Sequence, residues 1–94
     1  MTGASDPRPT LRLDKWLWQT RFYKTRTLAA EMVSRGKVRV NAKLTKKPAT
    51  TVGPGDTLTL VQGREIRVVR ITDIPERRGP ASEAALCFED VNSD

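Results

Sequence analysis

The chain has 94 residues, with 17 lysines and arginines against 11 aspartates and glutamates and a formal net charge of +6. This length fits one domain with a modest core. Histidine is absent and Cys87 is the single cysteine, which excludes an internal disulfide, a zinc site built from Cys and His, and imidazole as a general base. We therefore predict that the protein is not an enzyme and has no cofactor and no metal.

The positive charge is concentrated in the first half of the chain. Residues 8–47 carry twelve cations against two anions, whereas residues 48–94 carry five cations against eight anions. Such a basic half fits a polyanionic partner, nucleic acid first and an acidic membrane second. The N-terminal residues lack the apolar region of a secretory signal, and no apolar run reaches the length of a membrane span. These features favour a cytoplasmic protein that binds nucleic acid.

The first predicted elements are an arm and a helix. Residues 1–10 hold Gly, Ser and two prolines, a composition typical of a mobile arm. A helix is predicted from about Leu13 to Arg21, because apolar positions recur at helical spacing, and Trp16 on this stripe is expected in the core. Trp18 lies roughly 140° around the helix from Leu13. It either stacks on a base or is covered by the C-terminal segment, and we favour the second because an exposed tryptophan is costly.

A second helix is predicted after a short link. Thr25 is a candidate N-cap, and Gly36 is placed to end the helix in a left-handed conformation. The buried stripe of this helix consists of Leu28, Ala29, Met32 and Val33. Val38 and Val40 then alternate with polar residues, which predicts a strand over residues 37–41.

The rest of the chain predicts strands and turns. A turn at residues 41–43 is followed by a loop rich in Pro and Gly. Strands are predicted over residues 57–61 and 65–71 with a turn between them, and a short helix is predicted within residues 81–91, opening near Ser82. The fold class is therefore α+β, with two N-terminal helices packed on a small antiparallel or mixed sheet, then a C-terminal strand and a short helical extension.

Cations and one amide side chain stand at exposed positions of these elements. Arg12 and Lys15 point away from the first apolar stripe. Lys24 and Arg26 flank the start of the second helix, where free backbone N–H groups and the helix dipole favour a phosphate. On the strand and loop that follow, the exposed positions are Lys37, Arg39, Asn41, Lys43, Lys46 and Lys47. Each one alone is typical of a solvated surface charge, but with so few anions among them we predict that folding gathers them into one patch that neutralises phosphates.

Several spaced motifs in the same half resemble the S4-type RNA-binding domain. They are Arg12-Leu13-Asp14, Thr25-Arg26, Gly36 to Asn41, and Gly55-Asp56. Ala42 stands where that family has Gly. The segments LDKWLWQTRFYKTR and RRGPASEAAL are, in addition, similar to the bacterial heat-shock protein fifteen family. We therefore divide the chain into the arm (1–10), an S4-like RNA-binding domain (11–62) and a C-terminal extension (63–94) packed on the same domain.

The resemblance implies a function and a set of contacts. It implies a non-catalytic protein that binds ribosomal RNA on the large subunit, in a heat-shock and ribosome-rescue role. Mapped onto this sequence, the RNA face holds Arg12, Lys15, Lys24, Thr25, Arg26, Lys37, Arg39, Asn41 and Lys43. Asp14 becomes a structural acid that pairs with a nearby cation or caps the helix start. We expect a monomer with no small-molecule substrate and no membrane partner.

Two other functions stay open. Domains of the S4 type are often fused to pseudouridine synthases, so the chain is alternatively the RNA-recognition subunit of an RNA-modifying enzyme. The heat-shock-like C-terminal segment argues against that alternative. A second alternative is a protein-interaction module that uses the acidic half of the chain while the basic half is merely solvated.

Overall fold

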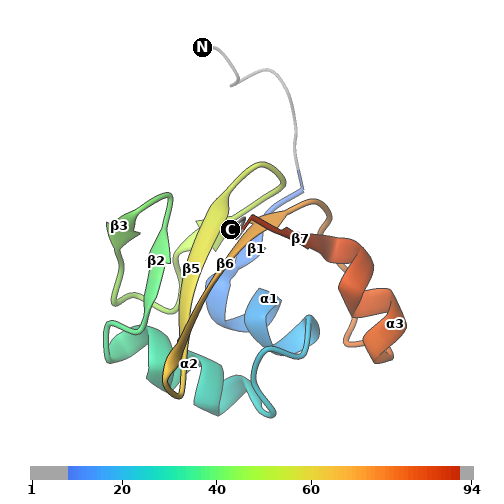
Figure 1. The fold of residues 1–94 in the computed structure, drawn as a ribbon. Helices are drawn as coiled ribbons and strands as arrows, with labels where there is room; N and C mark the ends of the chain where they lie inside the picture. The colour runs from blue at the N-terminus through green and yellow to red at the C-terminus, as the bar shows by residue number, and fades with distance from the viewer. Residues whose placement is uncertain (1–8, 92–94) are drawn as a thin grey trace.

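The computed structural model describes residues 9–91, and Figure 1 shows their fold. Most of the predicted arm, residues 1–8, lies outside the described residues. Along the chain the elements are β1 (Leu11–Arg12), α1 (Leu13–Gln19), α2 (Arg26–Ser34), β2 (Val38–Val40), β3 (Lys43–Leu44), β4 (Thr51–Val52), β5 (Thr57–Gln62), β6 (Glu65–Ile71), α3 (Ala81–Ala84), a 3-10 helix (Ala85–Cys87) and β7 (Phe88–Asp90). The predicted α+β class is confirmed.

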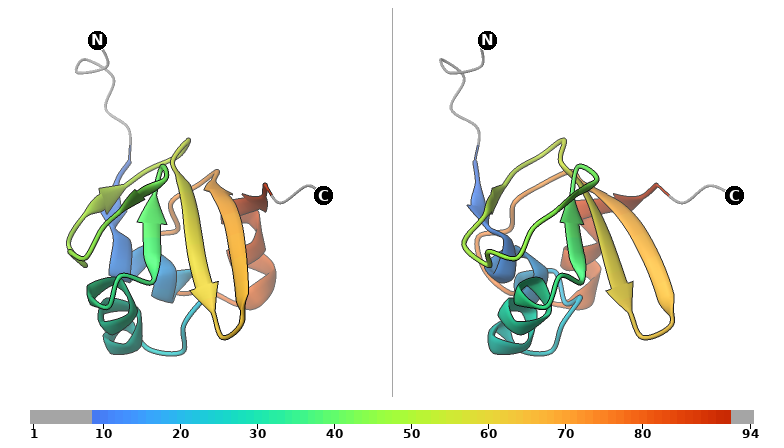
Figure 2. Two further views of the ribbon diagram at one scale, coloured as in Figure 1. Left: turned by 60° about the vertical axis from the view of Figure 1, so that its left-hand side comes forward. Right: turned by 90° about the vertical axis from the view of Figure 1, so that its left-hand side faces the viewer.

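The main sheet is antiparallel throughout. Its strand order is β3-β2-β5-β6-β7, while β1 pairs with β4 in a separate two-stranded sheet. Strands β5 and β6 form the longest pairing, from Thr57 opposite Arg70 to Gln62 opposite Glu65. Helices α1 and α2 lie together on one side of the main sheet (Figure 2). Within residues 9–91, no helix covers the other side of β2, β5 and β6 (Figure 2).

One core joins the two helices to the sheet. Its largest fully buried side chains are Trp16, Leu13, Leu17, Leu58, Leu60, Ile71, Val33, Val38, Val52 and Val69. They come from α1, α2, β2, β4, β5 and β6. This is expected because apolar residues recur at helical spacing in the N-terminal helices and at alternate positions in the strands that follow. The prediction that Trp16 belongs to the core is confirmed, because its side chain is fully buried.

Helix α1 ends two residues earlier than predicted. Arg21 has a φ of 67°, and the N–H of Phe22 donates to the carbonyl of Leu17 at 3.0 Å while that of Arg21 donates to Trp18 at 3.1 Å. This is a Schellman ending, in which the left-handed position is usually glycine. Here Nε of Arg21 donates to the carbonyl of Gly79 at 2.7 Å, which holds the unusual conformation in place.

Helix α2 has the caps that the sequence predicts. Oγ1 of Thr25 accepts a hydrogen bond from the N–H of Leu28 at 2.9 Å. At the other end Gly36 has a φ of 80°, and the N–H of Lys37 donates to the carbonyl of Met32 at 3.0 Å. Both ends of α2 are therefore fixed by local sequence.

Strand β4 (Thr51–Val52) lies in the segment predicted as a loop, so that prediction is wrong there, and strands β1 and β3 were not predicted. The turn predicted at residues 41–43 does join β2 to β3, since Val40 pairs with Lys43 across a two-residue connection. Asn41 and Ala42 both have positive φ, 53° and 70°, which is the geometry of the tight hairpin turn that matches strand twist. Each of the three missed strands has only two residues, which is too short for a periodicity to be visible.

The C-terminal segment packs against α1. Nε1 of Trp16 donates to the carbonyl of Asp73 at 3.2 Å, and Nε of Arg78 donates to the carbonyl of Trp18 at 3.1 Å. The Arg78 guanidinium also lies 5.7 Å from the centre of the Trp18 ring. The C-terminal segment therefore covers Trp18, as favoured from the sequence. The short helix begins at Ala81 but gives way to strand β7, so the helical prediction is wrong for Phe88–Asp90.

Candidate nucleic-acid interface

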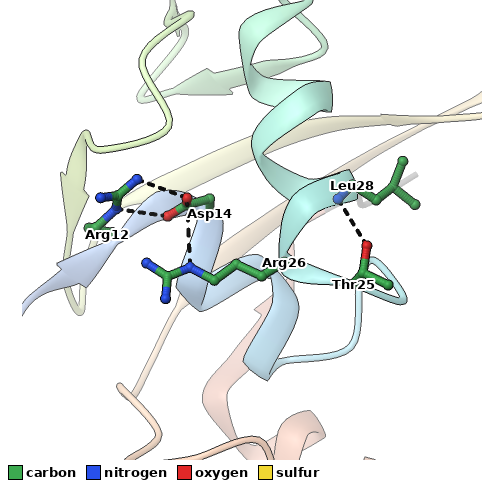
Figure 3. A network of polar contacts seen from close by, with 5 residues as sticks. All are labelled: Arg12, Asp14, Thr25, Arg26 and Leu28. Atoms are coloured by element: carbon green, nitrogen blue, oxygen red, sulfur yellow. Dashed lines mark hydrogen bonds and ion pairs between the residues drawn. The ribbon is translucent and has the colours of Figure 1, made fainter.

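A buried carboxylate organises two cations at the start of α1. Arg12 donates to Asp14 through two contacts, Nε to Oδ1 at 3.1 Å and Nη2 to Oδ2 at 3.0 Å. Arg26 forms an ion pair with the same carboxylate, with Nε 3.8 Å from Oδ2. Figure 3 shows the two guanidinium groups converging on Asp14 from β1 and from the start of α2. The role of Asp14 as a structural acid that pairs with a nearby cation is confirmed.

Exposure differs sharply within this trio. The Asp14 side chain is 4% exposed, whereas those of Arg12 and Arg26 are 49% and 43% exposed. The carboxylate is thus bound on the protein side of the cations, and the outer surface of each guanidinium stays open to solvent. An ion pair joined by two hydrogen bonds, as between Arg12 and Asp14, fixes the plane of the guanidinium group.

The loop before β4 fixes the position of the chain that carries Arg12 and Asp14. The N–H of Leu13 donates to the carbonyl of Thr50 at 2.7 Å, and that of Asp14 donates to Pro48 at 3.2 Å. These carbonyls satisfy backbone donors of the first turn of α1, which has no side-chain cap. These contacts hold the loop before β4 against the start of α1. No local pattern in the sequence signals them, since they join residues more than thirty positions apart.

The start of α2 adds further donors. Lys24 and Thr25 are exposed, and the first turn of α2 contains no acidic residue. The Thr25 hydroxyl oxygen accepts the Leu28 N–H, so Thr25 acts as the N-cap of α2. Among the described residues, Lys24 has no ion pair.

Lys15 and Lys43 lie on the helix side of the main sheet. Lys15 is half-buried on α1. Lys43 pairs directly with Val40 in β3 and β2, and directly opposed residues in an antiparallel pair project to the same face. Val40 packs on the core, so Lys43 projects to that side. It lines a groove of about 490 Å³ together with Val40, Asn41, Leu44, Thr45 and Thr50.

Asn41 has a structural role that was not predicted from the sequence. Its Oδ1 accepts from the N–H of Thr57 at 2.9 Å, and its Nδ2 donates to Oδ1 of Asp56 at 3.0 Å. Asp56 in turn accepts from the N–H of Gly53 at 2.9 Å. Both ends of the amide therefore tie the β2–β3 turn to the start of β5. The only signal in the sequence was that Asn41 and Gly55-Asp56 both belong to the motifs shared with the S4-type domain.

Lys37 and Arg39 do not join the other cations. They alternate with Val38, which is fully buried against the helices, so their side chains project from the opposite face of the sheet. The expectation of one basic patch is therefore corrected. The structure brings Arg12 and Arg26 together on Asp14 and places Lys37 and Arg39 on the opposite face of the sheet.

The described residues offer little for other chemistry. Within residues 9–91 no group of three or more His, Cys, Asp or Glu side chains is arranged to hold a metal ion. Cys87 is 5% exposed and its thiol lies 3.7 Å from the carbonyl of Glu83. Burial, and then the carboxylates of Asp73 and Glu83, raise the pKa of this thiol. None of the helices in the described part has both the length and the apolarity needed to cross a membrane.

Comparison with known proteins shows the family to which the chain belongs. A model of the S4 domain family matches residues 11–58, a range that includes the Arg12–Asp14–Arg26 trio and both α2 caps. The chain therefore belongs to the S4 domain family and, by the relatives that follow, to its heat shock protein 15 branch.

The relatives are similar along most of this chain. Heat shock protein 15 of Escherichia coli (strain K12) is 52% identical over 85 residues, which are 90% of this chain and 63% of that protein. The chain thus spans 63% of the length of that relative. The RQC P-site tRNA stabilizing factor of Listeria monocytogenes is 34% identical over 87 residues, 90% of this chain and 94% of the factor. A trimeric structure of Vibrio cholerae heat shock protein 15 superposes with a TM-score of 0.83 at 42% identity and covers 88% of this chain and 83% of its own.

Proposed function

We propose that this protein binds structured ribosomal RNA on the large ribosomal subunit, without catalysing a reaction, in a heat-shock or ribosome-rescue role. The observation that carries the proposal is the pair of half-exposed arginines held on one buried carboxylate. Asp14 orients the two guanidinium groups but leaves their outer surfaces free to meet phosphate oxygens. The name of the Listeria relative, a P-site tRNA stabilizing factor, supports a place on the ribosome beside transfer RNA.

The contacts that we propose are mainly to phosphates. We propose that they come from Arg12, Lys15, Lys24, Arg26 and Lys43. Thr25 and Asn41 support them by capping α2 and by fixing the hairpin turn. Cations that neutralise phosphates release counterions and supply affinity without reading the base sequence. RNA folded into a defined shape is the matching partner, because only the shape decides which phosphates meet all these cations together.

The site comes entirely from one chain. Arg12, Asp14 and Arg26 contact each other within the monomer, so no second copy is needed to complete it. We therefore propose that one chain is the RNA-binding unit, although the Vibrio relative was solved as a trimer. We propose the cytoplasm as the place of action.

Co-sedimentation with separated ribosomal subunits tests the proposal. The chain is expected to sediment with the large subunit, and less with the small one, and treatment with nuclease is expected to release it. Lys24→Glu should weaken the interaction at least tenfold without changing the circular dichroism spectrum, since Lys24 is exposed and unpaired in the described structure. Binding that survives nuclease, or a folded Lys24→Glu variant that binds as well as the parent, would contradict the proposal.

A pseudouridine synthase partner is the alternative that the same experiment can expose. In that case the chain would leave the ribosomal fractions and migrate with the enzyme. No contact in the described structure favours this alternative.

A further inference from the structure

The face of the sheet opposite the helices carries an organised row of side chains. Leu44, Arg39, Thr59 and Val68 pair in register across β3, β2, β5 and β6. Because Arg39 alternates with the buried Val38, and opposed residues share a face, the whole row points away from the core. We call this row, with Lys37, Val61 and Ile66, the outer face.

The outer face combines aliphatic and cationic side chains and is open to solvent. The exposed fraction of the side chain is 54% for Leu44 and 61% for Ile66, which pairs with Val61. Lys37, Arg39, Thr59, Val61 and Ile66 contribute to a groove of about 390 Å³. Ile66 and Val61 are therefore neighbouring aliphatic side chains in one groove, and such pairs mark a binding surface more often than isolated side chains do.

Arg39 is unlike most other arginines of the described structure. Ion pairs hold Arg12, Arg26, Arg35, Arg67, Arg70 and Arg77. Hydrogen bonds to backbone carbonyls hold Arg21 and Arg78. Within residues 9–91, Arg39 and Arg64 have neither, and Lys37 beside Arg39 has no ion pair. The outer face therefore presents two unneutralised cations next to aliphatic side chains.

The combination of free cations and aliphatic side chains indicates which kind of partner fits the outer face. Unpaired bases stack on aromatic rings, and none of the described side chains that line the groove is aromatic. Phosphates would satisfy the cations but leave the aliphatic side chains in water. In a second copy of the chain, Glu83 and Glu89, which flank the exposed Leu86 in sequence, are already paired with Arg77 and Arg70, and the crosslink described below separates a second copy from another protein.

We propose that the outer face docks a protein segment that presents carboxylates beside aliphatic side chains. The inference rests on the proposed function, under which that segment belongs to a protein of the large ribosomal subunit next to the RNA site. The sheet then separates two partners: RNA on the helix side and protein on the outer face. Aliphatic burial and charge pairing would both contribute to the second contact.

Photo-crosslinking on purified large ribosomal subunits tests the inference. Thr59→Cys places a thiol at the centre of the outer face, and Lys24→Cys places one at the proposed RNA site. Each variant is labelled with a benzophenone maleimide, bound, irradiated and analysed by mass spectrometry after digestion. The unsubstituted chain is the labelling control, since its Cys87 is buried.

The label at Thr59 is expected to join a protein segment that contains Asp or Glu beside aliphatic residues. Attachment to RNA, attachment to another copy of this chain, or no product would overturn the inference. The label at Lys24 reports separately on the proposed function and is expected to join RNA. The two proposals therefore fail independently.

A matched pair of variants checks the role of charge. Arg39→Gln should reduce the Thr59 crosslink at least fivefold, because it removes one of the two free cations of the outer face. Arg64→Gln removes the other arginine that has no ion pair or side-chain hydrogen bond in the described structure, and it should change the crosslink less than twofold. Equal effects of the two variants would show that net charge alone is responsible and would overturn the proposed pairing.

Discussion

Arg12 and Asp14, two residues apart in sequence, form a two-contact charge pair whose anion is buried and whose cation faces solvent. The distances are 3.1 Å from Nε to Oδ1 and 3.0 Å from Nη2 to Oδ2, and Arg26 approaches the same carboxylate from α2. An arginine held in this way loses less side-chain entropy when it meets a phosphate than a free one does. We therefore expect Asp14 to contribute to RNA binding although its own charge repels RNA.

Substitution of Asp14 separates orientation from net charge. Asp14→Asn removes one negative charge, so a purely electrostatic account expects RNA affinity to rise. We expect it to fall roughly threefold to tenfold, because Arg12 and Arg26 lose their shared anchor; a charge-assisted hydrogen bond is worth about 1.5–3 kcal/mol. Fluorescence anisotropy with a labelled ribosomal RNA fragment measures the change.

Glu31→Gln provides the control for charge. Glu31 forms an exposed ion pair with Arg35 within α2, with Nη2 of Arg35 2.7 Å from Oε2. Its removal changes the net charge by the same amount, but an exposed pair of this kind contributes only about 0.3–0.5 kcal/mol. Affinity should stay level or rise slightly. An equal rise in both variants would show that Asp14 has no positioning role.

Ala42 offers a gain in stability. Its φ of 70° is a conformation that costs an L-residue about 1–2 kcal/mol and that glycine adopts freely. Ala42→Gly should therefore raise the free energy of unfolding by about 1 kcal/mol, which corresponds to a melting temperature about 4–8 °C higher in a domain of this size. Differential scanning calorimetry checks the shift.

Gly63→Ala is the matched control for the turn. Gly63 has a φ of 61°, and a Cβ placed there would meet nothing within 4 Å. Its substitution should lower stability by about 1 kcal/mol through backbone conformation alone. If both substitutions were neutral, positive φ would carry no cost in these turns and the argument for Ala42 would fail.

Local signals in the sequence predict a large part of the fold. Thr25 and Gly36 mark the ends of α2 because caps depend on residues within one turn. The alternation of Val38 and Val40 predicts β2 because one face of that strand is buried. Such features need no knowledge of distant residues, and the structure confirms them.

Other features depend on contacts that no local pattern carries. Arg21 ends α1 where glycine is usual, and the carbonyl that supports it belongs to Gly79. The division of the cations between two faces follows from strand pairing: Arg39 opposes Thr59 while Lys43 opposes Val40. The sequence shows that these residues are basic and exposed, but only the register shows that they point in opposite directions.

The C-terminal extension should be needed for stability. The ring of Phe88 lies 4.8 Å from that of Phe22 and 6.4 Å from that of Trp16, centre to centre. Phe88→Ala should destabilise the chain by about 2–3 kcal/mol, somewhat below the usual range for a fully buried phenylalanine because Phe88 is partly exposed. Leu86→Ala, at a side chain that is 75% exposed, should change stability by less than about 0.5 kcal/mol. Urea unfolding compares them, and equal values would contradict the packing of residues 63–94 on the domain.

The buried Tyr23 should make the folded state less stable as the pH becomes alkaline. Burial raises the pKa of Tyr23 above its ordinary value of 10.0, and its hydroxyl has no hydrogen-bond partner in the described structure. Above pH 10 the unfolded chain loses the phenolic proton more readily than the folded chain, so this group lowers stability as pH rises from about 10 towards the folded pKa. Tyr23→Phe should remove that part of the decline between pH 8 and pH 11.

The same variant should also be more stable near neutral pH. An unsatisfied buried hydroxyl costs about 1–3 kcal/mol, so Tyr23→Phe is expected to gain about 1 kcal/mol at pH 7. Urea unfolding at pH 7, 8 and 11 measures both effects. A loss of stability at pH 7 would mean that the hydroxyl has a partner in solution.

The salt dependence of RNA binding tests the central claim most directly. For protein-free ribosomal RNA from the large subunit, the slope of log K against log salt is proportional to the number of phosphates that are neutralised, with about 0.7–0.9 for each contact. We predict that Lys24→Gln lowers the magnitude of the slope by about one contact, whereas Arg64→Gln, which removes an exposed cation at the β5–β6 turn, leaves it unchanged. A flat salt titration of the parent chain, or equal slopes for the parent and Lys24→Gln, would contradict an RNA site built around Asp14.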